Sequence, residues 1–161
     1  MTDLRAHRYT AQCSWQGSTS GGYQSYSRTH RVTALPAAPD LELSADPAFL
    51  GDAEQLNPEQ LLLIAASSCQ LLSFLAVAAR ARIDVIAYHD DAEAVMPPDD
   101  RPVRITDIWL RPRITVRAPA TEDRVRHLAA VAHRECFIAN SLRSRILVEP
   151  VVTIVKPDSP T

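Results

Sequence analysis

The longest apolar run of the chain covers residues 61–79 and is apolar on nearly every helical face. Just before it, Asn57 is a suitable N-cap, Pro58 fits a first helical position, and Glu59 complements the positive end of a helix dipole. This pattern predicts a helix over about residues 58–81. Because no face of it is polar, we expect the helix to be covered on all sides, by a sheet and by a second chain.

Shorter apolar stretches on both sides of this helix predict β-strands. The expected strands cover residues 8–16, 23–35, 41–45, 84–95, 104–118 and 146–155. The turn residues Ser-Gly-Gly at 20–22 join the first two strands into a β-hairpin. The apolar phase changes between Ile105 and Ile108, which indicates a bend or a bulge in the fifth strand.

Two further helices are expected in the C-terminal half of the chain. Residues 121–136 begin with Thr121 as an N-cap and carry acidic residues in the first turn. Residues 136–144 predict a short helix that follows directly. The resulting order, β-β-β-α-β-β-α-α-β, indicates the α+β class.

Composition and charge narrow the possible functions. The chain has 161 residues, of which 46% are hydrophobic and 22% are charged, as in an ordinary globular domain. We therefore expect one domain over residues 1–161, with residues 1–7 and 157–161 as loose termini. A formal net charge of -2 gives no electrostatic reason to expect nucleic acid or an anionic membrane as a partner.

The apolar run at residues 61–79 is long enough to be tested as a membrane span. Polar or thiol side chains occupy its middle: Ser67, Ser68, Cys69, Gln70 and Ser73. They predict a helix in a protein core and no membrane. The polar start MTDLRAHRYT lacks the apolar segment of a signal peptide, so we expect a cytoplasmic protein.

Three cysteines, Cys13, Cys69 and Cys136, are the first candidates for chemistry. Their odd number and wide spacing do not indicate a disulfide framework, and in the cytosol a thiol pair is more often catalytic or metal-binding than structural. Cys136 lies at a predicted helix start, where free backbone N–H groups favour a thiolate. Cys69 lies inside its helix, where apolar surroundings raise the pKa of a thiol unless a cation approaches from elsewhere.

Two other interpretations of these cysteines stay open. Free cysteine is among the most buried residue types and can fill a core as a small hydrophobic side chain. His133 and Cys136, three residues apart, could form half of a zinc site. No CxxC or HxxH pattern supplies the other half, so we expect no metal.

Two segments carry recognisable motifs. NPEQLLLIAASSC, residues 57–69, places a cysteine ten residues after the glutamate of an Asn-Pro-Glu-Gln-Leu motif. AHRECFIANSL, residues 132–142, contains an Ala-His-x-x-Cys segment. Both resemble the OsmC/Ohr family (osmotically inducible protein C and organic hydroperoxide resistance proteins). YSRTH, DPAFLGD, AYHDDAEAVM and LRPRITV extend the likeness to roughly residues 8–155.

The resemblance implies an OsmC-like α+β fold, with antiparallel sheets wrapped around a long central apolar helix in an intertwined homodimer. It also implies a thiol peroxidase that reduces organic hydroperoxides without a cofactor. Cys69 would become a sulfenic acid, and Cys136 would condense with it to a disulfide. An external dithiol, of lipoyl type or thioredoxin-like, would then reduce the disulfide.

In the family, a glutamate and an arginine position the peroxide. Glu59 matches the motif directly. For the arginine, family members related to Ohr have a Gly-Gly-Arg turn, whereas this chain has Tyr23 at that place. We expect Arg28 in this role, with Arg31 as the alternative. Because they lie three residues apart on a predicted strand, their side chains should point to opposite faces.

Helix geometry adds an expectation about assembly. Glu59 and Cys69 are ten residues apart, which corresponds to roughly 15 Å of a straight helix, so they cannot touch within one chain. Antiparallel pairing of two such helices about a two-fold axis would bring Glu59 of one chain near Cys69 of the other. We therefore expect an obligate homodimer with its active site at the interface.

The expected substrate follows from the apolar side chains around the thiols. Candidates for this lining are Leu62, Leu72, Phe74 and Phe137, and they favour an organic hydroperoxide over hydrogen peroxide. On the same fold, the cysteine pair could instead serve a redox sensor or a thiol-dependent hydrolase. From a different class, the chain could be a non-enzymatic protein that binds a small apolar ligand and has inert cysteines.

Overall fold

The chain divides into two compact units. In the computed structural model, which describes residues 6–156, the N-terminal unit ends at Leu61 and the C-terminal unit begins at Leu62. Residues 1–5 and 157–161, where loose termini were predicted, lie outside the described part of the chain. Helices and strands follow one another in the predicted order, which confirms the α+β class.

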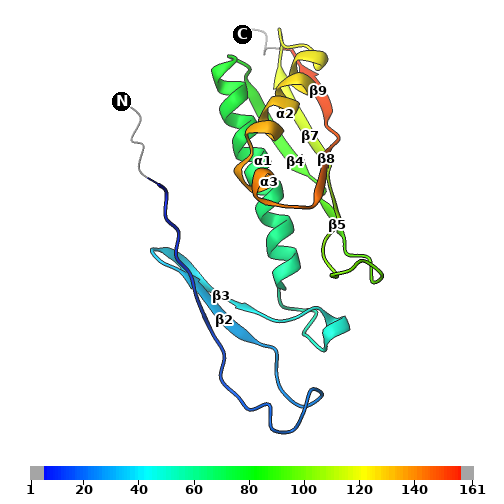
Figure 1. The fold of residues 1–161 in the computed structure, drawn as a ribbon. Helices are drawn as coiled ribbons and strands as arrows, with labels where there is room; N and C mark the ends of the chain where they lie inside the picture. The colour runs from blue at the N-terminus through cyan, green and yellow to red at the C-terminus, as the bar shows by residue number, and fades with distance from the viewer. Residues whose placement is uncertain (1–5, 157–161) are drawn as a thin grey trace. The chain divides into compact units, whose positions relative to one another are not determined.

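The N-terminal unit contains one three-stranded antiparallel sheet (Figure 1). In sheet order, its strands are β1 (Gln12–Ser14), β2 (His30–Ala34) and β3 (Ala37–Leu43). β1 and β2 pair as predicted, but a loop of residues 15–29 connects them instead of a tight turn. The Ser-Gly-Gly turn lies within that loop, where the N–H of Gly22 donates to the carbonyl of Thr19 at 3.0 Å.

The segment that follows β3 is a compact loop with a 3₁₀ turn, η1 (Pro47–Phe49). The carboxylate of Asp46 caps this turn by accepting a hydrogen bond from the N–H of Ala48 at 2.8 Å. A Cβ atom on residue 51 would lie 1.7 Å from the carbonyl oxygen of Ala45. Only glycine fits at such a close backbone approach, so Gly51 determines the path of the loop.

The central helix α1 (Pro58–Arg80) has well-defined ends, close to those predicted. The Asn57 side chain accepts from the N–H of Gln60 at 2.8 Å, and the Gln60 side chain accepts from the N–H of Asn57 at 3.0 Å. These two bonds form a capping box. At the other end, the N–H of Ile83 donates to a carbonyl of the last turn at 2.9 Å, and Arg82 has a left-handed φ of 58°. This Schellman arrangement satisfies the terminal carbonyls.

Much of α1 is left uncovered by the chain itself. Its buried residues are Ala66, Gln70, Phe74, Val77 and Ala78. On the opposite side, Ile64 is 49% exposed and Leu72 is 63% exposed. The predicted cover is therefore present on one side only. By length and mean hydropathy (2.1 over an 18-residue window), α1 also fits a membrane span, a test that the core helix of a soluble protein passes as well.

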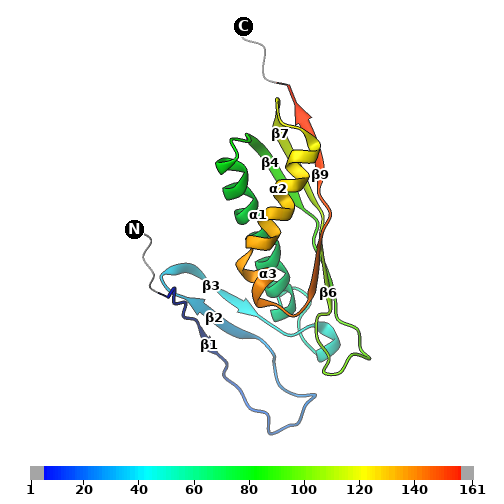
Figure 2. The same cartoon turned by 45° about the horizontal axis from the view of Figure 1, so that its top comes forward.

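The C-terminal unit contains two three-stranded sheets (Figures 1 and 2). One consists of β4 (Val85–Asp90), β7 (Pro112–Arg117) and β9 (Val151–Val155), and the other of β5 (Glu93–Val95), β6 (Asp107–Leu110) and β8 (Arg145–Val148). The pairs β4–β7 and β5–β6 are antiparallel, whereas β7–β9 and β6–β8 are parallel. Both sheets are thus mixed, which refines the expectation of antiparallel sheets.

Each long strand predicted for this unit is divided between the two sheets. The predicted strand 104–118 breaks at Arg111, and not between Ile105 and Ile108. The N–H of Arg111 donates to the carboxylate of Asp90 at 2.6 Å instead of to a neighbouring strand. Pro112, which follows, is buried and has no N–H to donate. These two residues explain why the strand bends at this point.

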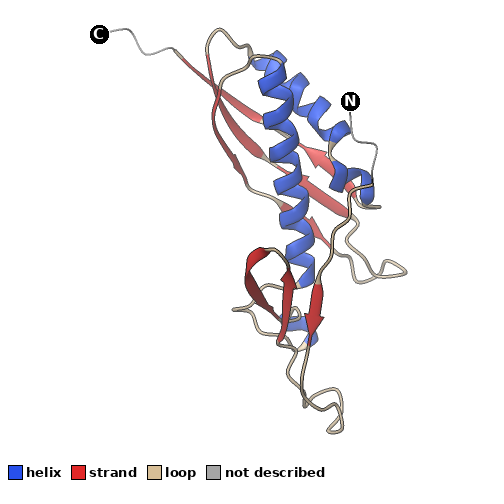
Figure 3. Cartoon of the chain, turned by 90° about the vertical axis from the view of Figure 1, so that its left-hand side faces the viewer, coloured by secondary structure: helices blue, strands red, loops and turns tan. Residues whose placement is uncertain are grey.

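The two longer helices, α1 and α2 (Glu122–Glu135), lie side by side on the strands of the C-terminal unit (Figure 3). A short helix, α3 (Phe137–Ser141), follows α2. The side chain of the buried Gln70 on α1 donates to the carbonyl of Ala129 on α2 at 3.1 Å. The core between helices and strands includes Phe74, Val77, Ile114, Val116, Val125 and Ala132.

Candidate active site

The structure brings Cys69 and Cys136 together, although they lie 67 residues apart in the sequence. Cys69 is in the middle of α1, and Cys136 occupies the junction where α2 ends and α3 begins. The two thiols lie close enough for each to affect the ionisation of the other. Cys136 is buried, and Cys69 is partly exposed. Both thiols are free, so the pair is described in its reduced form.

Cys69 has the more acidic thiol of the two. Burial acts against its ionisation, but hydrogen bonds from the N–H of Ile138, the thiol of Cys136, the N–H of Phe137 and the hydroxyl of Ser73 outweigh it. Together they lower the pKa of Cys69 below its ordinary value. Among the described residues of this chain, no cation is one of the main causes of this shift. The first residues of α3 supply the stabilisation instead.

Cys136 behaves in the opposite way. Burial raises the pKa of Cys136 to about 11, and the neighbouring Cys69 adds to this effect, although the N–H of Ala139 acts in the other direction. The N–H groups at the start of the short helix do act on Cys136 as predicted, but burial outweighs them, so the predicted net preference for a thiolate is wrong. The N–H groups of α3 act on both cysteines, but Cys136 is enclosed by the core, whereas Cys69 is partly exposed.

A pocket of about 580 Å³ opens beside Cys69. It is lined by Cys69, Leu72, Ser73, Ala76, Arg80, Glu135, Phe137 and Asn140. Leu72 and Phe137 are part of the lining, as predicted. Phe74 and Leu62 are not, because Phe74 is fully buried in the core and Leu62 packs against a second core cluster. At the edge of the pocket, Arg80 and Glu135 form an ion pair of 2.9 Å.

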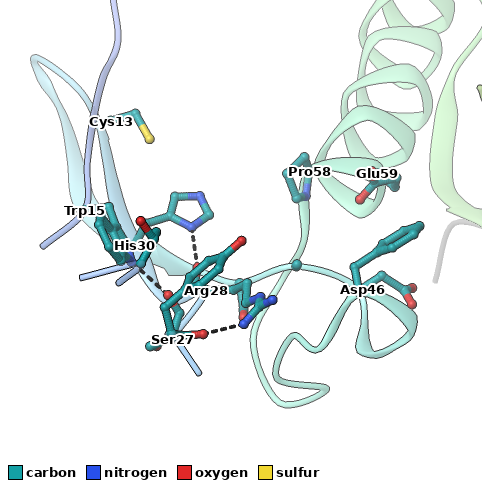
Figure 4. Close-up of a pocket in the computed structure, with 13 residues that line it drawn as sticks. Cys13, Trp15, Ser27, Arg28, His30, Asp46, Pro58 and Glu59 are labelled. Atoms are coloured by element: carbon teal, nitrogen blue, oxygen red, sulfur yellow. Dashed lines mark hydrogen bonds between the residues drawn. The ribbon is translucent and has the colours of Figure 1, made fainter. Parts of the chain in front are cut away.

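The other two predicted site residues, Arg28 and Glu59, line a separate cavity of about 490 Å³ within the N-terminal unit (Figure 4). The aromatic side chains of Trp15, Tyr26 and Phe49 give this cavity a largely apolar wall. Glu59 enters it from the first turn of α1 and makes no ion pair within residues 6–156.

Arg28 is held by its own loop. It lies before β2, and not on a strand as predicted. Its guanidinium stacks 3.9 Å from the ring centroid of Tyr26 and 4.7 Å from that of Tyr23, and it donates to the carbonyls of both tyrosines. The alternative, Arg31, is exposed and forms an ion pair of 3.6 Å with Asp40 outside the cavity. Arg28 is therefore the arginine that shares a cavity with Glu59.

Several residues of these two sites were not identified from the sequence. Ser73 hydrogen-bonds Cys69 from one helical turn further along α1, a spacing that could have identified it. Cys13 and His30 line the cavity of Arg28. Cys13 on β1 pairs with Val32 on β2. His30 lies two residues before Val32 on β2, so its side chain is on the same face of the sheet as that of Cys13. The ring Nδ1 of His30 lies 2.8 Å from the carbonyl of Arg28, which helps to fix the loop.

His133 and Cys136 have the spacing of half a zinc site. Within the part of the chain that the structure describes, no group of three or more His, Cys, Asp or Glu side chains is arranged to hold a metal ion. Nδ1 of His133 is buried without a hydrogen-bond partner, and burial lowers the pKa of this histidine.

A family match and several solved structures indicate the same family for this chain. The OsmC family, described as OsmC-like protein, matches residues 51–151. A solved OsmC-like protein of unknown function from Vibrio cholerae is 26% identical, with a TM-score of 0.82 over 91% of this chain and 100% of the other. No curated protein matches the sequence.

Two other solved structures share the fold at lower identity. One is an organic hydroperoxide resistance protein OsmC from Legionella pneumophila, 19% identical, with a TM-score of 0.67 over 92% of this chain and 98% of the other. The second is an organic hydroperoxide resistance protein from Elizabethkingia anophelis, 18% identical, with a TM-score of 0.70 over 95% of this chain and 100% of the other. Because the family match covers more than half of the sequence, the protein is a member of the OsmC family.

Proposed function

We propose that this protein is a cysteine-based thiol peroxidase that reduces organic hydroperoxides. The contact between Cys69 and Cys136 supports this function most directly, because the pKa values of the two thiols move in opposite directions. A thiol peroxidase with two cysteines needs one that ionises readily to attack the peroxide and a second that lies close enough to condense with the sulfenic acid. The names of the two hydroperoxide resistance proteins agree with this activity.

Cys69 carries out the first step. Its thiolate attacks the terminal oxygen of the hydroperoxide, the O–O bond breaks, and the leaving alkoxide takes up a proton to become an alcohol. The sulfur of Cys69 is oxidised to a sulfenic acid, and the hydroperoxide is reduced by the same two electrons. The partial exposure of Cys69 and the pocket beside it give the substrate access to the sulfur.

Cys136 carries out the second step. Its sulfur attacks the sulfenic acid of Cys69, the S–S bond forms, and the oxygen leaves as water with the proton of Cys136. The two thiols already interact in the reduced protein, which favours formation of the disulfide between them. An external dithiol, of lipoyl type or thioredoxin-like, then reduces the disulfide and restores both thiols.

Arg28 and Glu59 complete the site from a second copy of the chain. Within α1, Glu59 lies roughly 15 Å from Cys69 along the helix axis, too far for contact. The uncovered side of α1, with Ile64 and Leu72 exposed, is an apolar surface that a second copy can bury in an isologous dimer. In this homodimer, the Arg28–Glu59 cavity of one chain faces the thiols of its partner and binds the polar end of the hydroperoxide.

The substrate is an organic hydroperoxide. Leu72 and Phe137 beside the thiols, and the aromatic wall around Arg28, suit an alkyl or aryl group better than water. Cumene hydroperoxide should therefore be reduced faster than hydrogen peroxide. A clear preference for hydrogen peroxide would contradict this substrate class.

Turnover with a dithiol tests the proposal. The consumption of lipoic-acid dithiol is followed with cumene hydroperoxide for the wild type, Cys69→Ser and Cys136→Ser. We expect turnover only in the wild type, with Cys136→Ser stopping at a sulfenic acid that dimedone traps. Equal activity in Cys69→Ser would contradict the function. A wild type that forms the disulfide but does not turn over with lipoyl-type dithiols or thioredoxin would instead be a redox sensor.

A further inference from the structure

Tyr88 on β4 has a buried hydroxyl group without a hydrogen-bond partner among the described residues. Its ring packs against Phe74, with 5.9 Å between the ring centroids. A phenylalanine would fill this place equally well and would avoid the cost of an unpaired buried hydroxyl. The hydroxyl is therefore a group that the packing of the resting protein does not explain.

The surroundings of Tyr88 connect it to the cysteine pair. Tyr88 packs against the core cluster that contains Ala132 of α2, and Cys136 lies four residues beyond Ala132 on the same buried face. Asp90 lies two residues beyond Tyr88, on the same face of β4. Both oxygens of Asp90 are occupied, by the hydroxyl of Ser67 at 2.5 Å and by the N–H of Arg111 at 2.6 Å.

The hydroxyl of Tyr88 stays protonated under ordinary conditions. Burial raises the pKa of Tyr88 above its ordinary value, and the negative charges of Asp90 and of an ionised Cys136 act in the same direction. The packing of Tyr88 against the core cluster that contains Ala132, four residues before Cys136, places the phenol and this cysteine in the same part of the core. Tyr88 is a donor that lacks an acceptor, and Cys136 becomes an acceptor only when it loses its proton.

We propose that Tyr88 is a positioning residue for Cys136, and that its hydroxyl donates a hydrogen bond to the Cys136 sulfur as this thiol attacks the Cys69 sulfenic acid. This role rests on the proposed peroxidase function. In the step, the S–S bond forms, the S–O bond of the sulfenic acid breaks, and water leaves with the proton of Cys136. Tyr88 keeps its own proton throughout.

The hydrogen bond from Tyr88 acts in the second step, in which Cys136 attacks the sulfenic acid of Cys69. Cys136 is held protonated by burial and by the neighbouring Cys69, and the second cause disappears once Cys69 is an uncharged sulfenic acid. Burial remains, and a hydrogen bond from Tyr88 offsets it for the developing thiolate. The first step is independent of Tyr88, because the groups that lower the pKa of Cys69 are on α1 and α3 and at Cys136.

Tyr88→Phe separates the two steps in a rapid-mixing experiment. After one equivalent of cumene hydroperoxide, sulfenic acid formation at Cys69 should keep its wild-type rate. Disulfide formation should slow about tenfold, as expected for the loss of a hydrogen bond to a charged group, and its pH midpoint should rise. Thermal stability should be equal or higher, because the variant removes an unpaired buried hydroxyl. Tyr9→Phe, at a side chain that is 90% exposed, is the matched control.

A second readout does not require any peroxide chemistry. In a Cys69→Ser background, the rate of alkylation of Cys136 is measured against pH by mass spectrometry, with and without Tyr88→Phe. Asp90 on β4 keeps its bonds in both proteins, and burial lowers the pKa of His133 on α2, so His133 is neutral above pH 7. We expect the alkylation midpoint of Cys136 to move to higher pH in Tyr88→Phe.

The two experiments distinguish the possible failures. An unchanged alkylation midpoint, or disulfide formation at the wild-type rate in Tyr88→Phe, would overturn the role of Tyr88 and leave the peroxidase function intact. If the wild type forms no sulfenic acid, the peroxidase function fails, and this role fails with it.

Discussion

The cysteine pocket of the C-terminal unit and the Arg28–Glu59 cavity of the N-terminal unit are built by different means. At the cysteines, packed helices hold two sulfurs in contact, and backbone N–H groups of α3 set the pKa of Cys69. In the N-terminal unit, a loop holds Arg28 between two tyrosine rings, and the side chain of Glu59 has no ion-pair partner among residues 6–156. The first site lowers the pKa of a thiol, and the second presents a guanidinium and a carboxylate to one cavity. Neither contains all four predicted residues.

The largest expected effect comes from separating these two sites onto different chains. Arg28→Met and Cys69→Ser should each abolish peroxidase activity as homodimers. In a mixed dimer of the two variants, one site would combine Cys69 from one chain with Arg28 from the other. If the site forms between chains, the mixed dimer should regain about half of the wild-type activity. Co-expression with two affinity tags and a turnover assay of the doubly purified dimer provide the measurement.

The control for this experiment is a dimer in which both chains lack Cys69. A mixed dimer of Cys69→Ser with Cys69→Ser carrying the second tag should stay inactive. Absence of activity in the Arg28→Met/Cys69→Ser dimer, with dimer formation verified by mass, would mean that the site does not combine residues from two chains.

Gly51→Ala should disrupt the N-terminal unit without touching the thiols. The new Cβ would meet the backbone of Ala45, which has to move, so we expect a loss of about 3 kcal/mol or more in the free energy of unfolding. Gly22→Ala is the matched control, because its Cβ meets open space and the cost comes only from a φ of 87°, about 1 kcal/mol. Urea denaturation measures both. Equal losses in the two variants would show that the close approach at Ala45 is relaxed in solution.

Ser73→Ala should change the cysteine site by a smaller amount. The Ser73 hydroxyl helps to lower the pKa of Cys69, so its removal raises that pKa, and the rate of sulfenic acid formation should reach its plateau at higher pH. At a pH below the plateau, the rate should fall roughly threefold to tenfold, because one hydrogen bond to the thiolate is lost. Ser68→Ala, on the same helix beside Cys69, should keep the wild-type profile. A profile of Ser73→Ala identical to that of the wild type would assign the low pKa to α3 alone.

The smallest expected effect is at the end of α1. Arg82 has a φ of 58°, which glycine adopts without strain, so Arg82→Gly should raise the free energy of unfolding by about 0.5–1 kcal/mol. Arg82→Ala removes the same side chain but retains the strain, and it should give no gain. Thermal unfolding compares the two. A gain of the same size in both variants would place the effect in the side chain and not in the backbone.

The sequence predicted the ends of a helix better than the contacts between strands. The ends of α1 follow from Asn57, Pro58 and the residues after Arg80, all of which act within one helical turn. The division of the long strands was not predicted, because it depends on Asp90 accepting the N–H of Arg111 from a different strand. Alternation of apolar residues cannot reveal such a bond.

The candidate site shows the same limit. The motifs predicted Cys69, Cys136 and Glu59 as site residues, and Arg28 was preferred over Arg31 without a motif, but the predicted acidities of the two thiols were reversed. The prediction considered each cysteine with its own helix only. In the structure, the N–H groups at the start of α3 act on a sulfur of α1, and the core encloses Cys136. Acidity depends on this tertiary contact, which single-helix reasoning cannot supply.

Free-thiol titration with mass spectrometry after one equivalent of cumene hydroperoxide tests the central claim most directly. The chain has three free cysteines, Cys13, Cys69 and Cys136. The proposed mechanism predicts rapid loss of two thiols and recovery of a disulfide-linked peptide pair that contains Cys69 and Cys136, with Cys13 still reduced. Survival of all three thiols would contradict it and would favour a binding protein with inert cysteines.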